Sequence, residues 1–256
     1  MKIVTWNCRG ALRNKIEIID SLNADILVIQ ECENPKYSTA KYREWVGNNY
    51  LWVGENKNRG IGVFSKNEFS IQKLEWDGKF TLHGFRRKSK LTSWTTSDLK
   101  LFLPFSINKK YNLLAVWTKG QKGECFDYIG QFWKYLQIHY HELSNDNTII
   151  LGDFNSNQKW DREKRADAWW NHASVVEELK KMGFKSLYHF QNNELQGDET
   201  MGTYFHHKKY NQSHHIDYIF ATSNLLSQYK FEMGLYKDWI EISDHIPLIV
   251  NLKLKL

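Results

Sequence analysis

The sequence of 256 residues predicts one domain of layered α/β type, built on a mixed β-sheet. Three features of the chain support this fold class. Short apolar runs rich in β-branched residues are typical of buried strands. Segments with helical hydrophobic periodicity lie between some of these runs, and other runs follow one another closely enough to form antiparallel hairpins. No repeat, low-complexity tract or Pro/Ser-rich linker divides residues 1–256, so we expect a single domain.

The buried strands are expected at residues 3–6, 26–29, 113–117, 148–151, 216–220 and 246–250. Helices are expected at residues 12–22, 126–143 and 173–182, and Gly183 follows the last of them in a position typical of a helix C-cap. Residues 60–64 lead past a polar turn to residues 69–71, which predicts an antiparallel pair. Residues 99–105 and 111–117 predict a second pair across Asn108-Lys109-Lys110.

The composition is that of a folded, basic protein. Hydrophobic residues make up 41% of the chain, aromatic residues make up 15%, and only 3 residues are proline, so a sizeable core is expected and disorder is not. Lys and Arg number 35 against 29 Asp and Glu, which leaves a net charge of +6. That balance favours attraction to nucleic acid or anionic lipid headgroups, although many basic proteins bind neither.

The three cysteines, Cys8, Cys32 and Cys125, form no CxxC pair and leave an odd one over, unlike a secreted disulfide framework. Cys8 and Cys32 are expected to be buried structural thiols. The chain enters a strand-like segment at once without a signal leader, and no apolar run approaches the length of a membrane span. We therefore expect a soluble cytoplasmic protein with no membrane partner.

Polar residues that can bind a metal end three of the expected strands. Asn7 follows residues 3–6, Glu31 follows residues 26–30, and Asp153 follows residues 148–152. In layered α/β proteins the loops at one edge of the sheet gather into a cleft, so these three exits can converge although they lie far apart in the sequence. Each residue taken alone has a second explanation, because Asn, Asp and Glu also end strands as ordinary turn formers.

Two further segments near the C-terminus carry matching chemistry. Asp217 interrupts an apolar strand, where a carboxylate is costly to bury unless it meets a metal or a hydrogen-bond donor. Asp244 and His245 directly precede the last strand, and His245 is the natural partner for Asp217. Alone, Asp217 fits a structural salt bridge, Asp244 a turn cap and His245 a structural histidine. Together with Asn7, Glu31 and Asp153 they give residue types in an order that unrelated turn residues would rarely produce.

The segments that carry this set are Thr5-Trp6-Asn7, Ile29-Gln30-Glu31, Gly60-Ile61-Gly62-Val63, Leu151-Gly152-Asp153-Phe154-Asn155, His215-Ile216-Asp217-Tyr218 and Ser243-Asp244-His245. In type and order they resemble the signature of the endonuclease/exonuclease/phosphatase superfamily, and the resemblance runs over essentially the whole chain. It implies a four-layer α/β sandwich of two mixed β-sheets packed face to face and flanked by helices. It also implies phosphoester hydrolysis with Mg²⁺, or Mn²⁺ as a substitute, which suits carboxylate and amide oxygens.

The resemblance also implies a role for each residue. Glu31 is expected to hold the main metal, with Asn7 and Asp244 helping to position it or a second ion.

Asp217 is expected to orient His245, Asp153 to activate or align the attacking water, and Asn155 to donate to a phosphate oxygen. Whether Asp153 or His245 takes the proton of that water stays open, because one-metal and two-metal schemes give different answers.

Three more residues are candidates for substrate contact. Arg9 stands where the AP-endonuclease branch usually has an acidic or amide residue, and it fits either a phosphate contact or a solvated loop arginine. Trp117 stands where related enzymes carry histidine or tyrosine, and it fits either stacking on a base or core packing. His215 is expected to touch phosphate.

The leading hypothesis is a metal-dependent phosphodiesterase, most simply a nuclease acting on DNA or RNA. The alternative is a phosphatase or phosphodiesterase for small-molecule or lipid-headgroup phosphates, because substrate choice lies in the loops. A non-enzymatic nucleic-acid-binding module is disfavoured by the intact catalytic set. The sequence predicts no protein partner.

Overall fold

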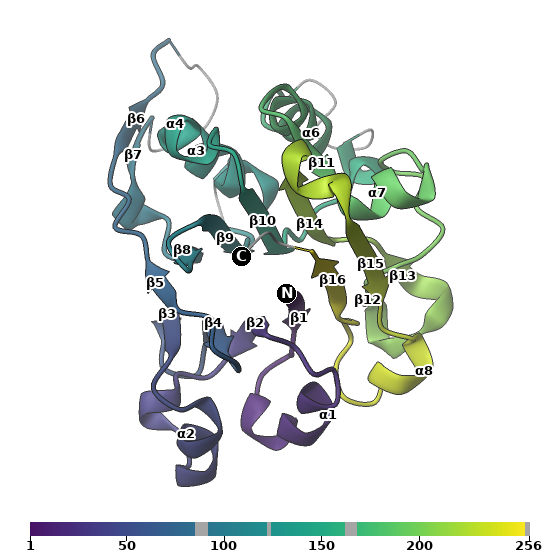
Figure 1. Cartoon of the computed structure of the whole chain (residues 1–256). Helices are drawn as coiled ribbons and strands as arrows, with labels where there is room; N and C mark the ends of the chain where they lie inside the picture. The colour runs from purple at the N-terminus through teal and green to yellow at the C-terminus, as the bar shows by residue number, and fades with distance from the viewer. Residues whose placement is uncertain (85–91, 122–123, 162–167, 254–256) are drawn as a thin grey trace.

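The computed structural model describes residues 1–84, 92–121, 124–161 and 168–253. Two mixed sheets of six strands each pack face to face, with helices on their outer faces (Figure 1). Each sheet contains one parallel pair. In the first sheet it is β1 (Lys2–Asn7) with β2 (Ile26–Cys32), and in the second it is β9 (Tyr111–Trp117) with β10 (Thr148–Asp153). All the other neighbouring strands are antiparallel.

The first sheet has the order β15 (Tyr229–Met233), β16 (Leu248–Leu252), β1, β2, β4 (Arg59–Ser65) and β3 (Tyr50–Asn56). The second has the order β11 (Phe184–Ser186), β14 (Asp217–Thr222), β10, β9, β8 (Phe102–Ile107) and β5 (Ile71–Lys73). Two small hairpins stand apart from the sheets, β6 (Lys79–Thr81) with β7 (Ser93–Thr95) and β12 (Tyr204–Phe205) with β13 (Ser213–His214).

The helices are short. The first sheet is covered by α1 (Ile16–Asp20), α2 (Ala40–Val46) and α8 (Tyr236–Trp239). The second is covered by α3 (Ile129–Ile138), α4 (Tyr140–Leu143) and α6 (His172–Lys181), while α7 (Leu187–Asn192) packs against β14. Among the described residues, no helix is both long enough and apolar enough to cross a bilayer.

The alternation of side chains along each strand produces the four layers. On β1, Ile3 packs between the two sheets, whereas Val4 packs under the helices of the first sheet. On β10, Ile149 and Leu151 face the space between the sheets, and Ile150 faces α3 and α6. Successive residues of a strand point to opposite faces, so a continuous apolar run serves two cores at once. The four-layer sandwich implied by the family resemblance is confirmed.

Most of the predicted elements are present, with shifted ends. Each of the six expected strands exists, and β1, β2 and β10 run on to include Asn7, Glu31 and Asp153. The helix expected at residues 12–22 is a 3-10 turn followed by α1, and the one expected at residues 126–143 breaks at His139 into α3 and α4. The helix before Gly183 is α6, and Gly183 has the positive φ of 87° expected of a C-cap glycine.

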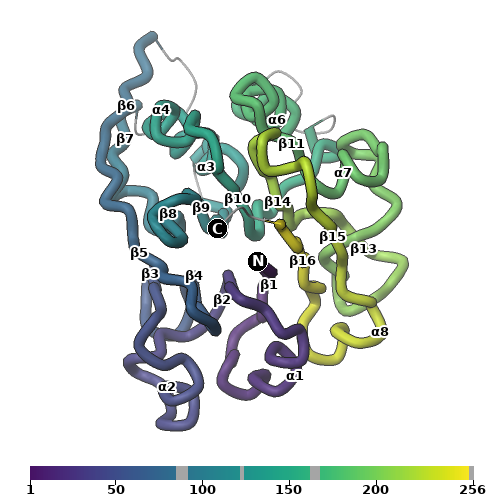
Figure 2. Tube along the Cα trace, viewed as in Figure 1, coloured from purple at the N-terminus to yellow at the C-terminus, as the bar shows by residue number. Residues whose placement is uncertain are grey.

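One predicted strand pairing is wrong. Residues 60–64 and 69–71 do not form a hairpin, because β4 pairs with β2 and β3, whereas β5 pairs with β8 in the second sheet. The chain crosses between the sheets at this point, as the tube in Figure 2 shows between β4 and β5. The other predicted pair, β8 with β9, is confirmed, and its turn places Asn108 and Lys109 at φ values of 51° and 54°.

Cys8 and Cys32 are free, buried thiols, as expected. Both pack in the core between the first sheet and its helices, beside Trp6 and Leu27. Burial raises the pKa of the Cys8 thiol to about 12, so it stays protonated and inert at neutral pH.

Candidate active site

The topology brings the predicted site residues to one edge of the sandwich. Because β1 and β2 are parallel, Asn7 and Glu31 lie at the same end of the first sheet. Asp153 ends β10, and the antiparallel strand β14 begins directly opposite it with Asp217. His245 precedes β16, which is antiparallel to β1, and therefore also lies at this edge.

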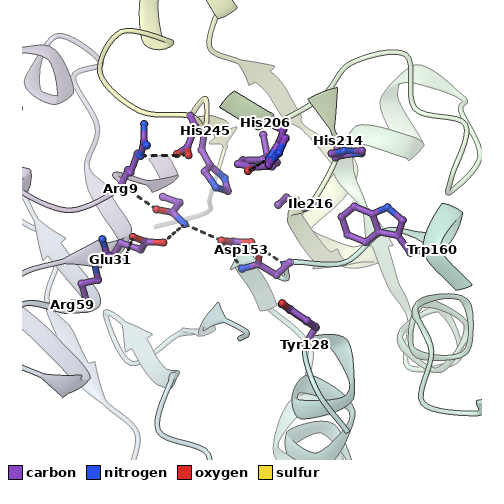
Figure 3. A pocket seen from close by; sticks show the side chains of 14 residues that line it. Arg9, Glu31, Arg59, Tyr128, Asp153, Trp160, His206, His214, Ile216 and His245 are labelled. Atoms are coloured by element: carbon purple, nitrogen blue, oxygen red, sulfur yellow. Dashed lines mark hydrogen bonds and ion pairs between the residues drawn. The ribbon is translucent and has the colours of Figure 1, made fainter. Parts of the chain in front are cut away.

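A cleft of about 620 Å³ opens at this edge. In Figure 3, Arg9, Glu31 and Arg59 lie on one side of it, Trp160 and His214 lie on the other, and Asp153 lies between them. The residues that line the cleft are Asn7, Arg9, Glu31, Arg59, Tyr128, Asp153, Asn155, Trp160, Tyr204, His206, His214, Ile216, Asp244 and His245.

Glu31 occupies an irregular position in β2. The register with β4 shifts between Gln30 and Cys32, and Glu31 has a φ of 60°, which is unusual for a residue with a side chain. The bulge interrupts the alternation of β2 and leaves the carboxylate in the cleft. Its Oε2 atom lies 3.2 Å from Nη1 of Arg59. Backbone strain of this kind is typical of functional sites.

Asn7 joins the two sheets. Its amide nitrogen donates to Oε1 of Glu31 at 3.2 Å and to Oδ2 of Asp153 at 2.9 Å, and its amide oxygen accepts from the backbone N–H of Arg9 at 3.0 Å. Asn7 therefore acts here as a spacer between two carboxylates. Binding a metal through its oxygen would require the amide to turn over.

Asp153 is fully buried and held by donors. The backbone N–H of Asn155 donates to Oδ1 at 2.8 Å, and Nδ2 of Asn155 donates to Oδ2 at 2.9 Å. Burial raises the pKa of Asp153 to about 7, with a further increase from Asp217, and these effects outweigh His245 and the hydrogen bonds. A carboxylate that changes charge near neutral pH is suited to accept a proton from water.

His245 and Asp217 form a buried pair, with 2.9 Å between Nδ1 and Oδ2. Burial acts to lower the pKa of His245, but Asp217 and Asp153 outweigh it and raise the pKa to about 9. Thr203 holds the start of β14, because its hydroxyl accepts from the N–H of Asp217. The hydroxyl of Ser243 donates to the carbonyl of Asn7 and accepts from the N–H of His245, which ties His245 to β1. The expected orienting role of Asp217 therefore has matching geometry.

Arg9 and Asp244 lie on the rim. Nε of Arg9 is 3.5 Å from Oδ2 of Asp244, and the Arg9 side chain is half exposed above the cleft. Arg9 therefore has the reach that a phosphate contact needs.

Two expected substrate contacts are corrected by the structure. Trp117 is only 4% exposed and packs between the sheets, because the alternation of β9 turns it inward together with Leu113 and Ala115. His215 is 2% exposed and does not line the cleft, and its Nδ1–H donates to the carbonyl oxygen of Met201 at 2.9 Å. Burial lowers the pKa of His215 to about 4, so it is neutral at neutral pH and cannot present a cation to phosphate.

Asn155 is placed differently from the expectation. Its Nδ2 donates to Thr118 O at 3.0 Å as well as to Asp153, so both amide hydrogens are used within the protein. In this arrangement Asn155 orients Asp153, and a donation to phosphate would require one of these bonds to break.

Arg59, Tyr128 and Tyr204 line the cleft although the sequence did not single them out. Arg59 directly precedes the Gly60-Ile61-Gly62-Val63 segment. Tyr204 and His214 stack at 6.4 Å between ring centroids, and Trp160 lies 5.2 Å from His214. We call Tyr204, His214 and Trp160 the aromatic wall of the cleft. The basic residues Arg162, Lys164 and Arg165, which follow Trp160 in the sequence, and the run Arg86–Lys90 lie outside the described residues.

A buried polar network supports the corner before Asp217. Nε2 of His189 lies 3.1 Å from a carboxylate oxygen of Glu199, and Asn157 donates to Glu199 at 3.0 Å and to the carbonyl of His215 at 2.9 Å. Burial acts to raise the pKa of Glu199, but the hydrogen bonds from His189, Asn157 and Gly197 outweigh it and lower the pKa to about 2.

Replacing Glu199 by glutamine is expected to destabilise the protein by about 1.5–3 kcal/mol at pH 7, since a charged hydrogen-bond acceptor is lost. A carboxylate with a lowered pKa stabilises the fold above its unfolded pKa, and that contribution disappears as pH falls toward 2. Chemical denaturation should therefore show that the difference in free energy of unfolding between wild type and Glu199→Gln becomes smaller from pH 7 to pH 3. A difference that stays constant with pH would contradict the lowered pKa of Glu199.

The donor set of the cleft fits a hard divalent cation. It consists of carboxylate and amide oxygens, and the only cation against Glu31 in the described structure is the guanidinium of Arg59. Asp153, Asp217 and His245 also place ligand atoms within 4.8 Å of one another. That trio is less suited to metal, because His245 is hydrogen-bonded through Nδ1 and its raised pKa favours the protonated form, which has no free lone pair. Glu31, with Asp244 and Asn7 nearby, is the better candidate.

The sequence matches the model of the Endonuclease/Exonuclease/phosphatase family over residues 4–245. No curated protein sequence matches the chain. Among solved structures, an AP endonuclease from Archaeoglobus fulgidus is 18% identical, with a TM-score of 0.66 and coverage of 99% of this chain and 100% of that one.

A 3′ phosphatase from Neisseria, solved with a product DNA hairpin, is 17% identical, with a TM-score of 0.65 and coverage of 99% and 100%. An AP endonuclease from Leishmania major is 17% identical, with a TM-score of 0.64 and coverage of 99% and 88%. At these identities the likeness shows a shared fold.

Proposed function

Because the chain belongs to the endonuclease/exonuclease/phosphatase family, and is thus an enzyme of a phosphoesterase fold, we propose that it is a Mg²⁺-dependent nuclease. The observation that carries this proposal is the composition of the cleft. The carboxylates of Glu31 and Asp153 lie in the cleft, and two arginines, Arg9 and Arg59, lie beside Glu31 on one side of it. Arginine is suited to phosphate, and Coulomb attraction to a polyanion adds to it.

The aromatic wall supports a nucleic acid over a simple phosphate ester. Trp160 and His214 place aromatic rings on the side of the cleft opposite the arginines (Figure 3). Nucleic-acid bases stack on aromatic side chains whatever the base, and each stacked base contributes about 1–3 kcal/mol. The strained Tyr128, with φ 49° and ψ −117°, adds another ring at the cleft. A phosphate monoester of a small polar alcohol would leave these rings unused.

The proposed chemistry divides between two buried groups. Asp153, with its pKa near neutrality, takes the proton of the attacking water, and Asn7 and Asn155 hold its carboxylate in place. His245, kept protonated by Asp217, faces the cleft as a hydrogen-bond donor to the charge that develops on phosphate.

A Mg²⁺ ion bound by Glu31, with Asp244 and Asn7 as further oxygen donors, would supply charge neutralisation at the phosphate, and Mn²⁺ would substitute.

We place the enzyme in the cytoplasm, in keeping with the free thiols of Cys8 and Cys32.

Pure protein with Mg²⁺ or Mn²⁺ is expected to cleave at least one of plasmid DNA, single-stranded DNA, abasic duplex or RNA, and EDTA is expected to abolish cleavage. Gel electrophoresis of labelled substrates measures this, and the ladder distinguishes endo from exo action. Raising the salt concentration should weaken cleavage by raising KM, because substrate phosphates release counterions on binding.

Phosphorylated small molecules and lipid-headgroup phosphates serve as the comparison substrates. Hydrolysis of these alone, with every nucleic acid intact, would replace the nuclease by a phosphatase. Activity that survives EDTA would contradict metal dependence in either case.

A further inference from the structure

The ion pair between Arg59 and Glu31 has no part in the chemistry described above. Nη1 of Arg59 lies 3.2 Å from Oε2 of Glu31, the carboxylate best placed to hold a metal. Both side chains line the cleft, with Glu31 18% exposed and Arg59 58% exposed, so the guanidinium and a metal ion in the cleft would reach the same carboxylate. Arg59 and a metal ion would therefore compete for the same oxygen.

The backbone under Arg59 is held firmly. Arg59 is the first residue of β4 and pairs with Asn56 at the tip of the β3–β4 hairpin. A Cβ atom on Gly60 would lie 2.4 Å from the ring of Trp52, so that ring covers the glycine directly. Nε1 of Trp52 donates to the carbonyl of Cys32, next to Glu31, at 3.3 Å. The hairpin is thus tied to the bulge that presents Glu31, while the side chain of Arg59 is more than half exposed.

The pair contributes little to stability. Ion pairs between partly exposed side chains stabilise a protein only slightly, because water screens the charges and two flexible side chains must be ordered. Arg59 is therefore easily released. A divalent cation at Glu31 would repel the guanidinium, whereas a phosphate oxygen in the cleft would attract it.

We propose that Arg59 is a phosphate-binding arm controlled by the metal: it shields Glu31 in the metal-free protein and turns to the substrate phosphate when Glu31 holds a divalent cation. This inference rests on the nuclease proposed above. Its consequence is that metal and nucleic acid bind cooperatively through one side chain. Such coupling is reciprocal, so each ligand strengthens the other by the same factor.

The first test measures metal binding without any substrate. Isothermal titration calorimetry with Mn²⁺ is expected to show that Arg59→Gln binds the ion about two- to fivefold more tightly than wild type, because a competing cation is gone. Arg43→Gln is the matched control: it removes the same charge from α2, outside the cleft, and should bind Mn²⁺ as wild type does. Weaker Mn²⁺ binding by Arg59→Gln would show that Arg59 supports the metal site and would overturn the proposal.

The second test measures DNA binding on an Asp153→Asn background, which prevents cleavage. Fluorescence anisotropy of a fluorescein-labelled single-stranded DNA is expected to show that Arg59→Gln weakens binding about tenfold with Mn²⁺ and much less in EDTA. With Mn²⁺, Arg59→Lys should bind the DNA more weakly than wild type and more tightly than Arg59→Gln, because lysine keeps the positive charge but lacks the planar guanidinium. An equal loss with and without Mn²⁺ would contradict release by the metal. If the parent Asp153→Asn protein binds neither single-stranded DNA, duplex DNA, abasic duplex nor RNA, the nuclease proposal fails, while the Mn²⁺ comparison still decides whether Arg59 shields Glu31.

Discussion

Replacing Asp153 by asparagine is expected to lower kcat by about 10³-fold or more, with the fold intact. Asparagine has the same shape but cannot take a proton from water. Asp153 is also the point where both sheets meet, because Asn7 from the first sheet and Asn155 from the second both donate to it. The change removes a buried charge, but it also turns an N–H₂ group toward a donor from Asn7 or Asn155, so some loss of stability is expected and folding is measured together with activity.

Single-turnover cleavage with the best substrate of the panel measures this effect, and circular dichroism confirms folding. Asp146→Asn is the control, since Asp146 is exposed in the turn before β10 and carries the same chemical change to the far end of the same strand. A folded Asp153→Asn protein with near-wild-type kcat would remove Asp153 from the chemistry.

Replacing His245 by glutamine is the second change expected to have a large effect, about 10³-fold in kcat. Glutamine can still donate a hydrogen bond, but it carries no positive charge toward the phosphate. His141→Gln is the control, because His141 is exposed on α4. Retention of more than about a tenth of the wild-type kcat would mean that the charge of His245 is not used.

The charge of His245 also predicts a pH dependence. Asp217→Asn removes the partner that raises the pKa of His245, so the loss of activity at high pH should begin at a lower pH than in wild type. A histidine with a raised pKa stabilises the fold fully below its unfolded pKa of about 6.5, and loses this contribution as pH rises through about 9. The difference in free energy of unfolding between wild type and His245→Gln, measured by chemical denaturation, should therefore be larger at pH 6 than at pH 9.5. An alkaline limb that stays in place in Asp217→Asn would rule out His245 as its origin.

The sequence predicted which residues gather at this edge of the sandwich. Asn7 and Glu31 lie at or next to the ends of the parallel strands β1 and β2, and Asp153 ends β10 in the other sheet. Asp217 was recognisable because a carboxylate inside an apolar strand needs a buried partner, and His245 is that partner.

The errors arise where tertiary packing decides the outcome. Trp117 pairs with Asp153 across β9 and β10 and points to the same face, yet it packs in the core between the sheets and does not line the cleft. His215 lies two residues before the first residue of β14, and its side chain is buried outside the cleft. The wrong pairing of residues 60–64 with residues 69–71 has a similar cause, since a polar turn looks the same whether the chain returns to its own sheet or crosses to the other. Arg59 was missed because its role depends on the bulge at Glu31, which no local sequence pattern announced.

The bond from Asn7 to Asp153 crosses the seam between the sheets, with one partner on β1 and the other on β10. The pair of His245, before β16, and Asp217, at the start of β14, crosses the same seam, and the interior between the sheets is apolar packing, which is not directional. A small slip of one sheet over the other would leave every strand intact and still separate Asp153, the proposed base, from Glu31, the proposed metal ligand. Cleavage activity should therefore depend on how the two sheets are aligned. On heating, we expect the rate of cleavage to fall before the far-ultraviolet circular dichroism signal of the strands is lost.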